Sequence, residues 1–99
     1  MDIRHAVGVK VGIPPATLEA LGEYRTSPAF TERERAALQF AEEIVRDDRD
    51  VSEACFTRVA GRFAEPEIVE LVFIVGYQVF ASKFAKALWL ARQEFAKTP

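Results

Sequence analysis

Apolar residues recur at helical spacing along most of the chain, and no segment alternates with period two over enough residues to indicate a strand. Residues 2–11 carry apolar side chains at intervals of three and four, and Gly12 is placed to end this first helix. Pro14 and Pro15 stand where proline is tolerated, at the N-terminal end of a helix. They lead into a short predicted helix over 16–24, which Gly22 weakens. The first quarter of the chain is therefore predicted to form two short helices.

The next two helices have recognisable start signals. Thr31 opens the motif T-E-R-E, in which its hydroxyl can accept the amide hydrogen of Glu34 while the Glu34 carboxylate reaches back, forming a capping box. This box predicts a helix over 32–47, and Ser52 is placed to cap a fourth helix. The residues expected inside are Ala37, Leu38, Ala41, Ile44 and Val45 on the third helix and Phe56, Val59, Ala60 and Phe63 on or after the fourth.

The last third of the chain is the most apolar. From Pro66 to Ala96 there is no further proline, which predicts either one long helix or two helices with a bend near Gly76 or Ser82. Residues 68–81 are apolar nearly all round, and we therefore expect this segment to be the most buried of the chain.

Composition and charge exclude several classes of protein. The 99 residues, 49% of them hydrophobic and 28% charged, suit one domain with one modest core. The net charge of −2 comes from 13 basic and 15 acidic residues that are interspersed, which gives no footprint for nucleic acid or an anionic membrane. The apolar run 71–81 is about half of the ~20 residues that a membrane-spanning helix needs and is followed by Lys83 and Lys86, so it is interpreted as a core helix. Because residues 1–5 lack the order of a secretory signal, we expect a cytoplasmic protein without membrane contact.

The cysteine and histidine content limits the chemistry. Cys55 is the only cysteine, which excludes an intrachain disulfide and a thiolate metal cluster built from one chain. It stands beside Phe56 and is interpreted as a packing residue. Glu67 and Glu70 share a helix face, but no histidine stands at matching spacing. We therefore expect no metal and no cofactor.

Three segments carry a resemblance to a known family. They are DIRHAVGVKVGIPPATLEAL (2–21), YRTSPAFTERERAALQFAEEI (24–44) and FAEPEIVELVFIVGYQVFASKFAKAL (63–88). The order of Y-R-x-S-P-x-F, then T-E-R-E-R-A-A-L, then E-I-V-E-L resembles the second half of the carboxymuconolactone decarboxylase family, which includes the alkylhydroperoxidase D-like proteins. The resemblance covers nearly the whole chain. It implies a compact all-α fold of about five helices, one domain over 1–99, that assembles into oligomers and lacks the family's N-terminal helices.

The resemblance also suggests candidate site residues at the start of the chain. In peroxidase members, the two cysteines of C-x-x-C and a histidine four residues after the second perform thiol chemistry. If Met1 stands in the place of the second cysteine, His5 takes the histidine position. If Asp2 and Gly12 anchor the match, that cysteine would lie just before Met1 and Arg4 takes the histidine position; we prefer this alignment because it keeps two positions ten apart.

The candidate catalytic residues are therefore His5, Arg4, Asp2 and Glu70. Each also has a structural interpretation. His5 suits a satisfied structural histidine, and Arg4 and Asp2 suit solvated charges at a helix start. Glu70 suits a structural carboxylate paired with Arg35 or Arg62.

Two classes of function stay open. In the first, the chain is part of a thiol peroxidase or related oxidoreductase and is inactive as a peroxidase in this form, because one cysteine cannot both attack the peroxide and resolve the sulfenic acid. In the second, the chain is complete and forms a noncatalytic oligomeric or small-ligand-binding module. A lactone decarboxylase is a third alternative, since its chemistry needs a proton donor and an anion-binding group in one pocket.

The apolar content also predicts self-association. Eight phenylalanines and a tryptophan exceed what a chain of this length is expected to bury, so we expect a symmetric homo-oligomer between a dimer and a hexamer. One apolar face expected to be exposed lies on the long helix, and the residues expected in the interface between subunits are Phe73, Phe80, Phe84 and Trp89. The other lies on the first helix, at Ile3, Val7 and Val11, and this helix is expected to pack against a neighbouring subunit.

Overall fold

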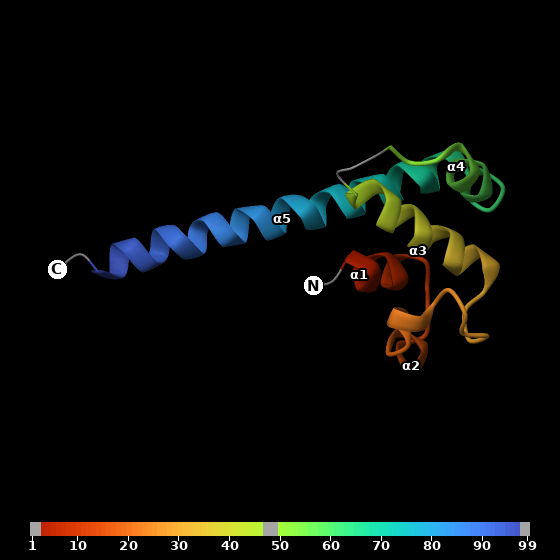
Figure 1. Ribbon diagram of the computed structural model, residues 1–99, viewed down its shortest axis with the longest axis horizontal. Coiled ribbons are helices and arrows are strands. Elements are labelled where there is room, and N and C mark those ends of the chain that lie inside the picture. Colours follow the sequence, from red (N-terminus) through yellow and green to blue (C-terminus); the bar gives the residue numbers. More distant parts are fainter. Residues whose placement is uncertain (1–2, 47–49, 98–99) are drawn as a thin grey trace.

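The computed structural model describes residues 3–46 and 50–97, and these residues form helices and connecting turns with no strand (Figure 1). The predicted all-α fold with five helices is confirmed for this part of the chain. In chain order the elements are α1 (Ile3–Lys10), α2 (Pro15–Leu18), the 3-10 helix η1 (Leu21–Glu23), α3 (Glu32–Val45), α4 (Glu53–Ala60) and α5 (Glu65–Lys97).

The predicted helix starts and stops are formed by the expected side chains. The Thr31 hydroxyl accepts a hydrogen bond from the Glu34 amide at 3.1 Å, and the Glu34 carboxylate accepts one from the Thr31 amide at 2.8 Å. The Ser52 hydroxyl accepts from the Cys55 amide at 3.1 Å and so caps α4. Gly12, with φ of 85°, takes the left-handed conformation that ends α1.

Two helix boundaries differ from the prediction. The expected helix 16–24 is divided into α2 and η1, because the chain tightens into a 3-10 turn around Gly22. Helix α3 stops at Val45, since Arg46 adopts an extended backbone, and position 47 of the predicted helix lies outside the described residues.

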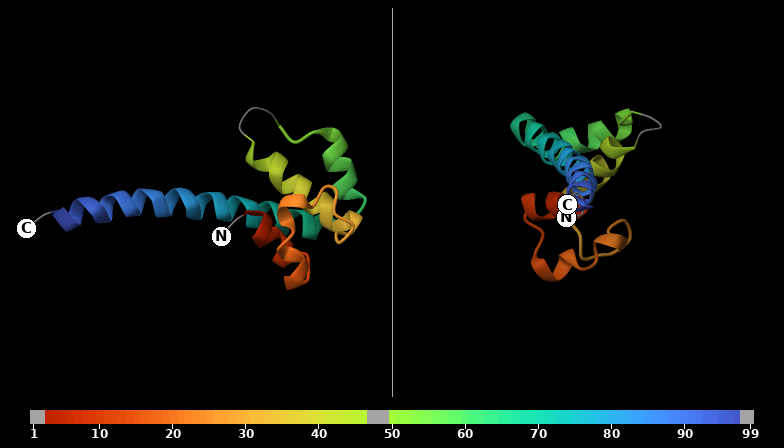
Figure 2. Two further views of the ribbon diagram at one scale, coloured as in Figure 1. Left: turned by 60° about the horizontal axis from the view of Figure 1, so that its bottom comes forward. Right: turned by 90° about the vertical axis from the view of Figure 1, so that its left-hand side faces the viewer.

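Helix α3 is the centre of the core. It contacts α1, α4 and α5, and Figure 2 shows these helices gathered around it. Contrary to expectation, Val45 and Phe56 are 38% and 50% exposed and Ala60 is exposed. Val45 is the last residue of α3, and the Phe56 ring contacts Phe40 of α3 edge to face, with ring centres 6.5 Å apart, so only part of it is covered. The buried hydrophobic residues on α3 are Ala36, Ala37, Leu38, Phe40 and Ala41; the others include Val7 on α1, Cys55 and Val59 on α4, and Leu71 and Val75 on α5.

The expectation that residues 68–81 are the most buried segment is wrong. Leu71 and Val75 are buried, but Val69 and Phe73 are 61% and 69% exposed. Only the first turns of α5 lie against the other helices; the rest of this one continuous helix projects away from them (Figures 1 and 2). The longest dimension is therefore 57 Å against 30 and 24 Å for the other two.

Two further expectations about burial differ from the structure. Val7 is fully buried, because α1 packs against both α3 and α5, so it is not part of an exposed face. The apolar part of α5 is also longer than the run 71–81. Glu65–Trp89 is long and apolar enough to cross a membrane by length and composition, and 11% of that window is buried. The interpretation as a buried core helix is wrong, and a single helix of this kind is weak evidence for a membrane span.

Replacing Gly12 by alanine should destabilise the fold through backbone conformation alone. An added Cβ would meet no heavy atom within 4 Å, but the left-handed conformation at φ 85° disfavours any side chain. We expect Gly12→Ala to lower the free energy of unfolding by about 1–2 kcal/mol in urea titrations. Gly22→Ala is the matched control, since its Cβ also meets nothing within 4 Å and its φ is not positive. Equal losses in both variants would contradict this account.

Candidate functional site

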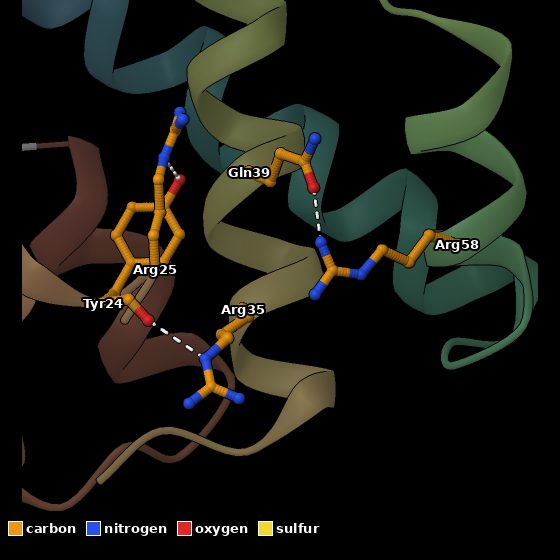
Figure 3. A pocket seen from close by; sticks show the side chains of 5 residues that line it. All are labelled: Tyr24, Arg25, Arg35, Gln39 and Arg58. Carbon is orange, nitrogen blue, oxygen red and sulfur yellow. Dashed lines mark hydrogen bonds between the residues drawn. The ribbon is translucent and has the colours of Figure 1, made fainter. Parts of the chain in front are cut away.

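Three segments that lie far apart in the sequence line a pocket of about 170 Å³. Tyr24 and Arg25 directly follow η1, and Arg58 lies in the last turn of α4. Arg35 and Gln39 are four residues apart on α3, so they lie on one side of that helix. Figure 3 shows the five side chains around the pocket, with Arg58 pointing toward Gln39 and Arg35 toward the Tyr24 carbonyl.

Arg35 holds the η1 segment against α3. Its Nε donates to the Tyr24 carbonyl at 3.1 Å, and one terminal nitrogen donates to the Ser27 carbonyl at 2.5 Å. The other terminal nitrogen lies 2.9 Å from the Glu32 carboxylate. One guanidinium therefore binds two backbone carbonyls and one carboxylate, which fixes the wall of the pocket.

Arg58 forms the opposite side of the pocket. It donates to the Gln39 side-chain oxygen at 2.5 Å and to the Glu32 carboxylate at 2.9 Å. Glu32 thus lies between Arg58 and Arg35. Hydrogen bonds from both arginines, with the larger effect from Arg58, hold the pKa of the Glu32 carboxyl below its ordinary value. Glu32 is therefore ionised at neutral pH, and it keeps the two guanidinium groups close together.

Arg25 lies along the third side. Its Nε donates to the Tyr24 hydroxyl at 3.3 Å, and its guanidinium lies 5.7 Å from the centre of the Tyr24 ring. The same guanidinium binds the Glu42 carboxylate, an interaction that raises the pKa of Arg25 above its ordinary value. Burial raises the pKa of the Tyr24 phenol, so this hydroxyl stays protonated and neutral.

The pocket carries a surplus of positive charge. Three guanidinium groups face two carboxylates, those of Glu32 and Glu42, which leaves one net positive charge among these five groups. A third carboxylate, Glu43, accepts from the Gln39 amide at 3.0 Å but also binds Arg46 at 3.4 Å. A guanidinium has five N–H donors, and the bonds described use two or three on each arginine of the pocket. The arrangement is therefore suited to binding a carboxylate rather than to transferring protons.

The residues singled out from the sequence lie elsewhere. Arg4 and His5 are half-buried in the first turns of α1, and Asp2 lies outside the described residues. Glu70 is exposed on α5, and its carboxylate lies 2.5 Å from Lys10 of α1. The expected pairing of Glu70 with Arg35 or Arg62 is therefore replaced by a pairing with Lys10, because the last residue of α1 lies beside this turn of α5 and Arg35 faces the Tyr24 and Ser27 carbonyls instead.

Cys55 is a buried thiol, as expected from its position beside Phe56. It is 2% exposed, and burial, followed by the nearby negative charge of Glu43, raises the pKa of the thiol to about 11. Glu43 is itself held ionised, because the Ser52 amide donates to its carboxylate at 2.9 Å and lowers its pKa. A thiol with this pKa is almost entirely protonated at neutral pH and is a poor nucleophile. In the described part of the chain, no three side chains of histidine, cysteine, aspartate or glutamate are grouped to hold a metal.

Four residues of the pocket were not identified from the sequence, and the fifth, Arg35, was considered only as a partner for Glu70. The adjacent Tyr24 and Arg25 form part of the Y-R-x-S-P motif, and Arg35 belongs to the T-E-R-E-R helix start. The signal for the pocket in the sequence was the arginine that each of these two motifs carries, Arg25 and Arg35. Their convergence depends on how α4 packs against α3, which the spacing of residues along the chain does not reveal.

Comparison with known proteins gives one informative match. Over 82 residues the chain is 32% identical to "Uncharacterized protein YnjA" of Escherichia coli (strain K12). The match covers 83% of this chain and 45% of that protein, so the chain spans less than half the length of this relative. No protein-family model matches the chain, and no solved structure matches it significantly. The name of the relative states no activity, and the match therefore assigns none to this chain.

The buried thiol predicts a dependence of stability on alkaline pH. The thiol has a pKa of about 11 in the folded chain and an ordinary value of 9.0, so above pH 9 the unfolded chain loses this proton first. The contribution is fully present below about pH 9 and is lost toward about pH 11. Between about pH 8 and about pH 10.5 the free energy of unfolding should therefore fall by roughly 2 kcal/mol, since one unit of pKa difference corresponds to about 1.4 kcal/mol. Urea titrations of Cys55→Ala should fall less steeply over this range than those of the unaltered chain, and parallel curves would contradict the assignment.

Proposed function

We propose that this chain is a helical protein of the carboxymuconolactone decarboxylase type whose body binds a small organic anion, and that it has no dithiol peroxidase activity. The observation that carries the proposal is the pocket lined by Arg25, Arg35 and Arg58 together with Tyr24 and Gln39. The proposal corresponds to the ligand-binding module among the classes considered from the sequence.

The size and charge of the pocket define the class of ligand. A cavity of about 150 Å³ is enough to hold a benzene ring, so a pocket of about 170 Å³ suits a single ring or a chain of a few carbons. The single surplus positive charge suits one carboxylate, which guanidinium groups bind through paired hydrogen bonds. The Tyr24 hydroxyl and the Gln39 amide can position further polar atoms of the ligand.

The family assignment has its support in the motifs of the sequence and in the helical architecture. The segments T-E-R-E-R-A-A-L and E-I-V-E-L open α3 and the apolar part of α5 in the order that the resemblance implies. A thiol peroxidase mechanism is disfavoured, because such a mechanism requires an accessible thiolate of low pKa and Cys55 is buried with a raised pKa. A cytoplasmic location is part of the same proposal, since a free cysteine suits a reducing compartment.

Calorimetric titration with benzoate and with acetate tests the anion site. We expect saturable binding of benzoate that Arg58→Gln weakens about 10- to 100-fold, since a hydrogen bond to a charged group contributes about 1.5–3 kcal/mol. Arg62→Gln is the control, because it removes the same charge from an exposed position outside the pocket. Circular dichroism of both variants checks that the helices persist. The site would be contradicted if neither benzoate nor acetate bound, or if the two variants weakened benzoate binding equally.

Peroxidase activity should be absent. With dithiothreitol as reductant and hydrogen peroxide as substrate, we expect consumption of peroxide at the rate of the protein-free mixture, because the only thiol is buried and protonated. Steady turnover that disappears in Cys55→Ser would overturn this part of the proposal.

A further inference from the structure

Helix α5 has two apolar faces, and the other helices cover only one of them. Leu71 and Val75 on the covered face are 2% and 1% exposed. A second set of apolar side chains on the same helix is at least 52% exposed. We call this set the α5 stripe; its members are Val69, Phe73, Tyr77, Phe80, Phe84 and Leu88.

The spacing of the α5 stripe makes it a continuous surface. Successive members are four, four, three, four and four residues apart, which is an 11-residue repeat. Because each residue turns an α-helix by about 100°, all six fall within an arc of about 100°, opposite Leu71 and Val75. Phe73 stacks on Tyr77 with ring centres 6.2 Å apart, and Phe80 stacks on Phe84 at 5.5 Å. The rings therefore form two stacked pairs along one side of the helix.

We propose that the α5 stripe of one chain packs against the α5 stripe of a second copy, with the two helices antiparallel. The spacing of the stripe is symmetric about the point between residues 78 and 79, so a reversed copy of the helix offers the same series of positions. A two-fold axis through this point gives the self-complementary contact that a symmetric dimer requires. In this register Val69 faces Leu88 of the partner subunit, Phe73 faces the partner's Phe84 and Tyr77 faces the partner's Phe80.

A hollow beside the start of the stripe fits this direction of pairing. It has a volume of about 310 Å³ and lies between Lys10 of α1 and the α5 residues Val69, Glu70, Phe73 and Ile74. The antiparallel register brings the partner's Phe84 and Leu88 to this hollow. The second half of α5 projects free of the body, so side chains of a partner's helix end can reach the hollow, whereas a parallel pair would bring the α1 helices of both copies to the same end (Figure 1).

The exposed area is sufficient for a dimer. Each aromatic side chain of the stripe offers on the order of 200 Å², so the exposed parts of its four rings amount to roughly 500 Å². A stable interface buries about 800 Å² on each partner. The four rings therefore supply more than half of this area, and Val69 and Leu88 add to it.

A second copy is favoured over a lipid bilayer as the occupant. Inserting Glu65–Trp89 into a membrane would require Leu71 and Val75 to leave the core and would break the ion pair between Glu70 and Lys10. Pairing of the α5 stripes keeps all these contacts. It also leaves Lys83 and Lys86 in water, since neither lies within the arc of the stripe.

Disulfide trapping in a Cys55→Ser background tests the register. We expect the double variant F73C/F84C to form covalent dimers under mild oxidation at micromolar concentration, because residue 73 faces residue 84 of the partner. The single variants F73C and F84C should stay uncrosslinked. Like residues would lie about 16 Å apart along the axis, beyond the ~7 Å limit for the Cα atoms of a disulfide. Crosslinking of the single variants would establish a parallel pair and overturn the proposal.

Light scattering supplies the second readout. We expect the unaltered chain to have twice its mass of 11.1 kDa, and Phe80→Glu to raise the dimer dissociation constant at least about 100-fold. Phe56→Glu on α4 is the matched control, since Phe56 is also half exposed but lies off the stripe; it should stay dimeric. A monomer in the unaltered chain, or its co-sedimentation with phosphatidylcholine vesicles, would overturn the proposal. The benzoate titration is independent of these outcomes, because the anion pocket lies within one chain.

Discussion

Leu38 lies fully buried on α3, the helix that α1, α4 and α5 all contact. Small side chains beside it, Ala36, Ala37 and Ala41, allow the neighbouring helices to approach closely. The capping box formed by Thr31 and Glu34 fixes where this helix begins. The rotation of α3 then determines which of its residues face the core and which face the pocket.

The anion pocket depends directly on this placement. Arg35 and Gln39 lie on the side of α3 that faces η1 and α4, and the core residues lie on other sides. Glu32, in the first turn, holds Arg35 and Arg58 together although the two arginines come from different helices. Without the carboxylates of Glu32 and Glu42, three neighbouring guanidinium groups would repel one another. The same carboxylates leave a surplus of only one charge for a ligand.

The size of the body explains the exposure of α5. A body formed by one central helix and three shorter ones can cover only part of a helix of 33 residues. The covered part includes Leu71 and Val75, and beyond it the apolar residues have no cover from the described part of the chain. The radius of gyration of 16.3 Å therefore exceeds the ~13 Å of a globular domain of this length. The exposed aromatic rings are consequently concentrated on one projecting helix.

The sequence by itself determined that the chain is helical and where several of its helices begin and end. The Thr31 and Ser52 caps, the stop at Gly12 and the apolar periodicity of α3 act between residues a few positions apart, so local chemistry is enough to predict them. Burial of Cys55 followed from the same local pattern. Only the tertiary structure decided that α5 is largely exposed, that Glu70 pairs with Lys10, and that Tyr24, Arg35 and Arg58 share a pocket. These features depend on which helices lie side by side and on how much surface a small body can cover, and neither is encoded in the spacing of residues along a single helix.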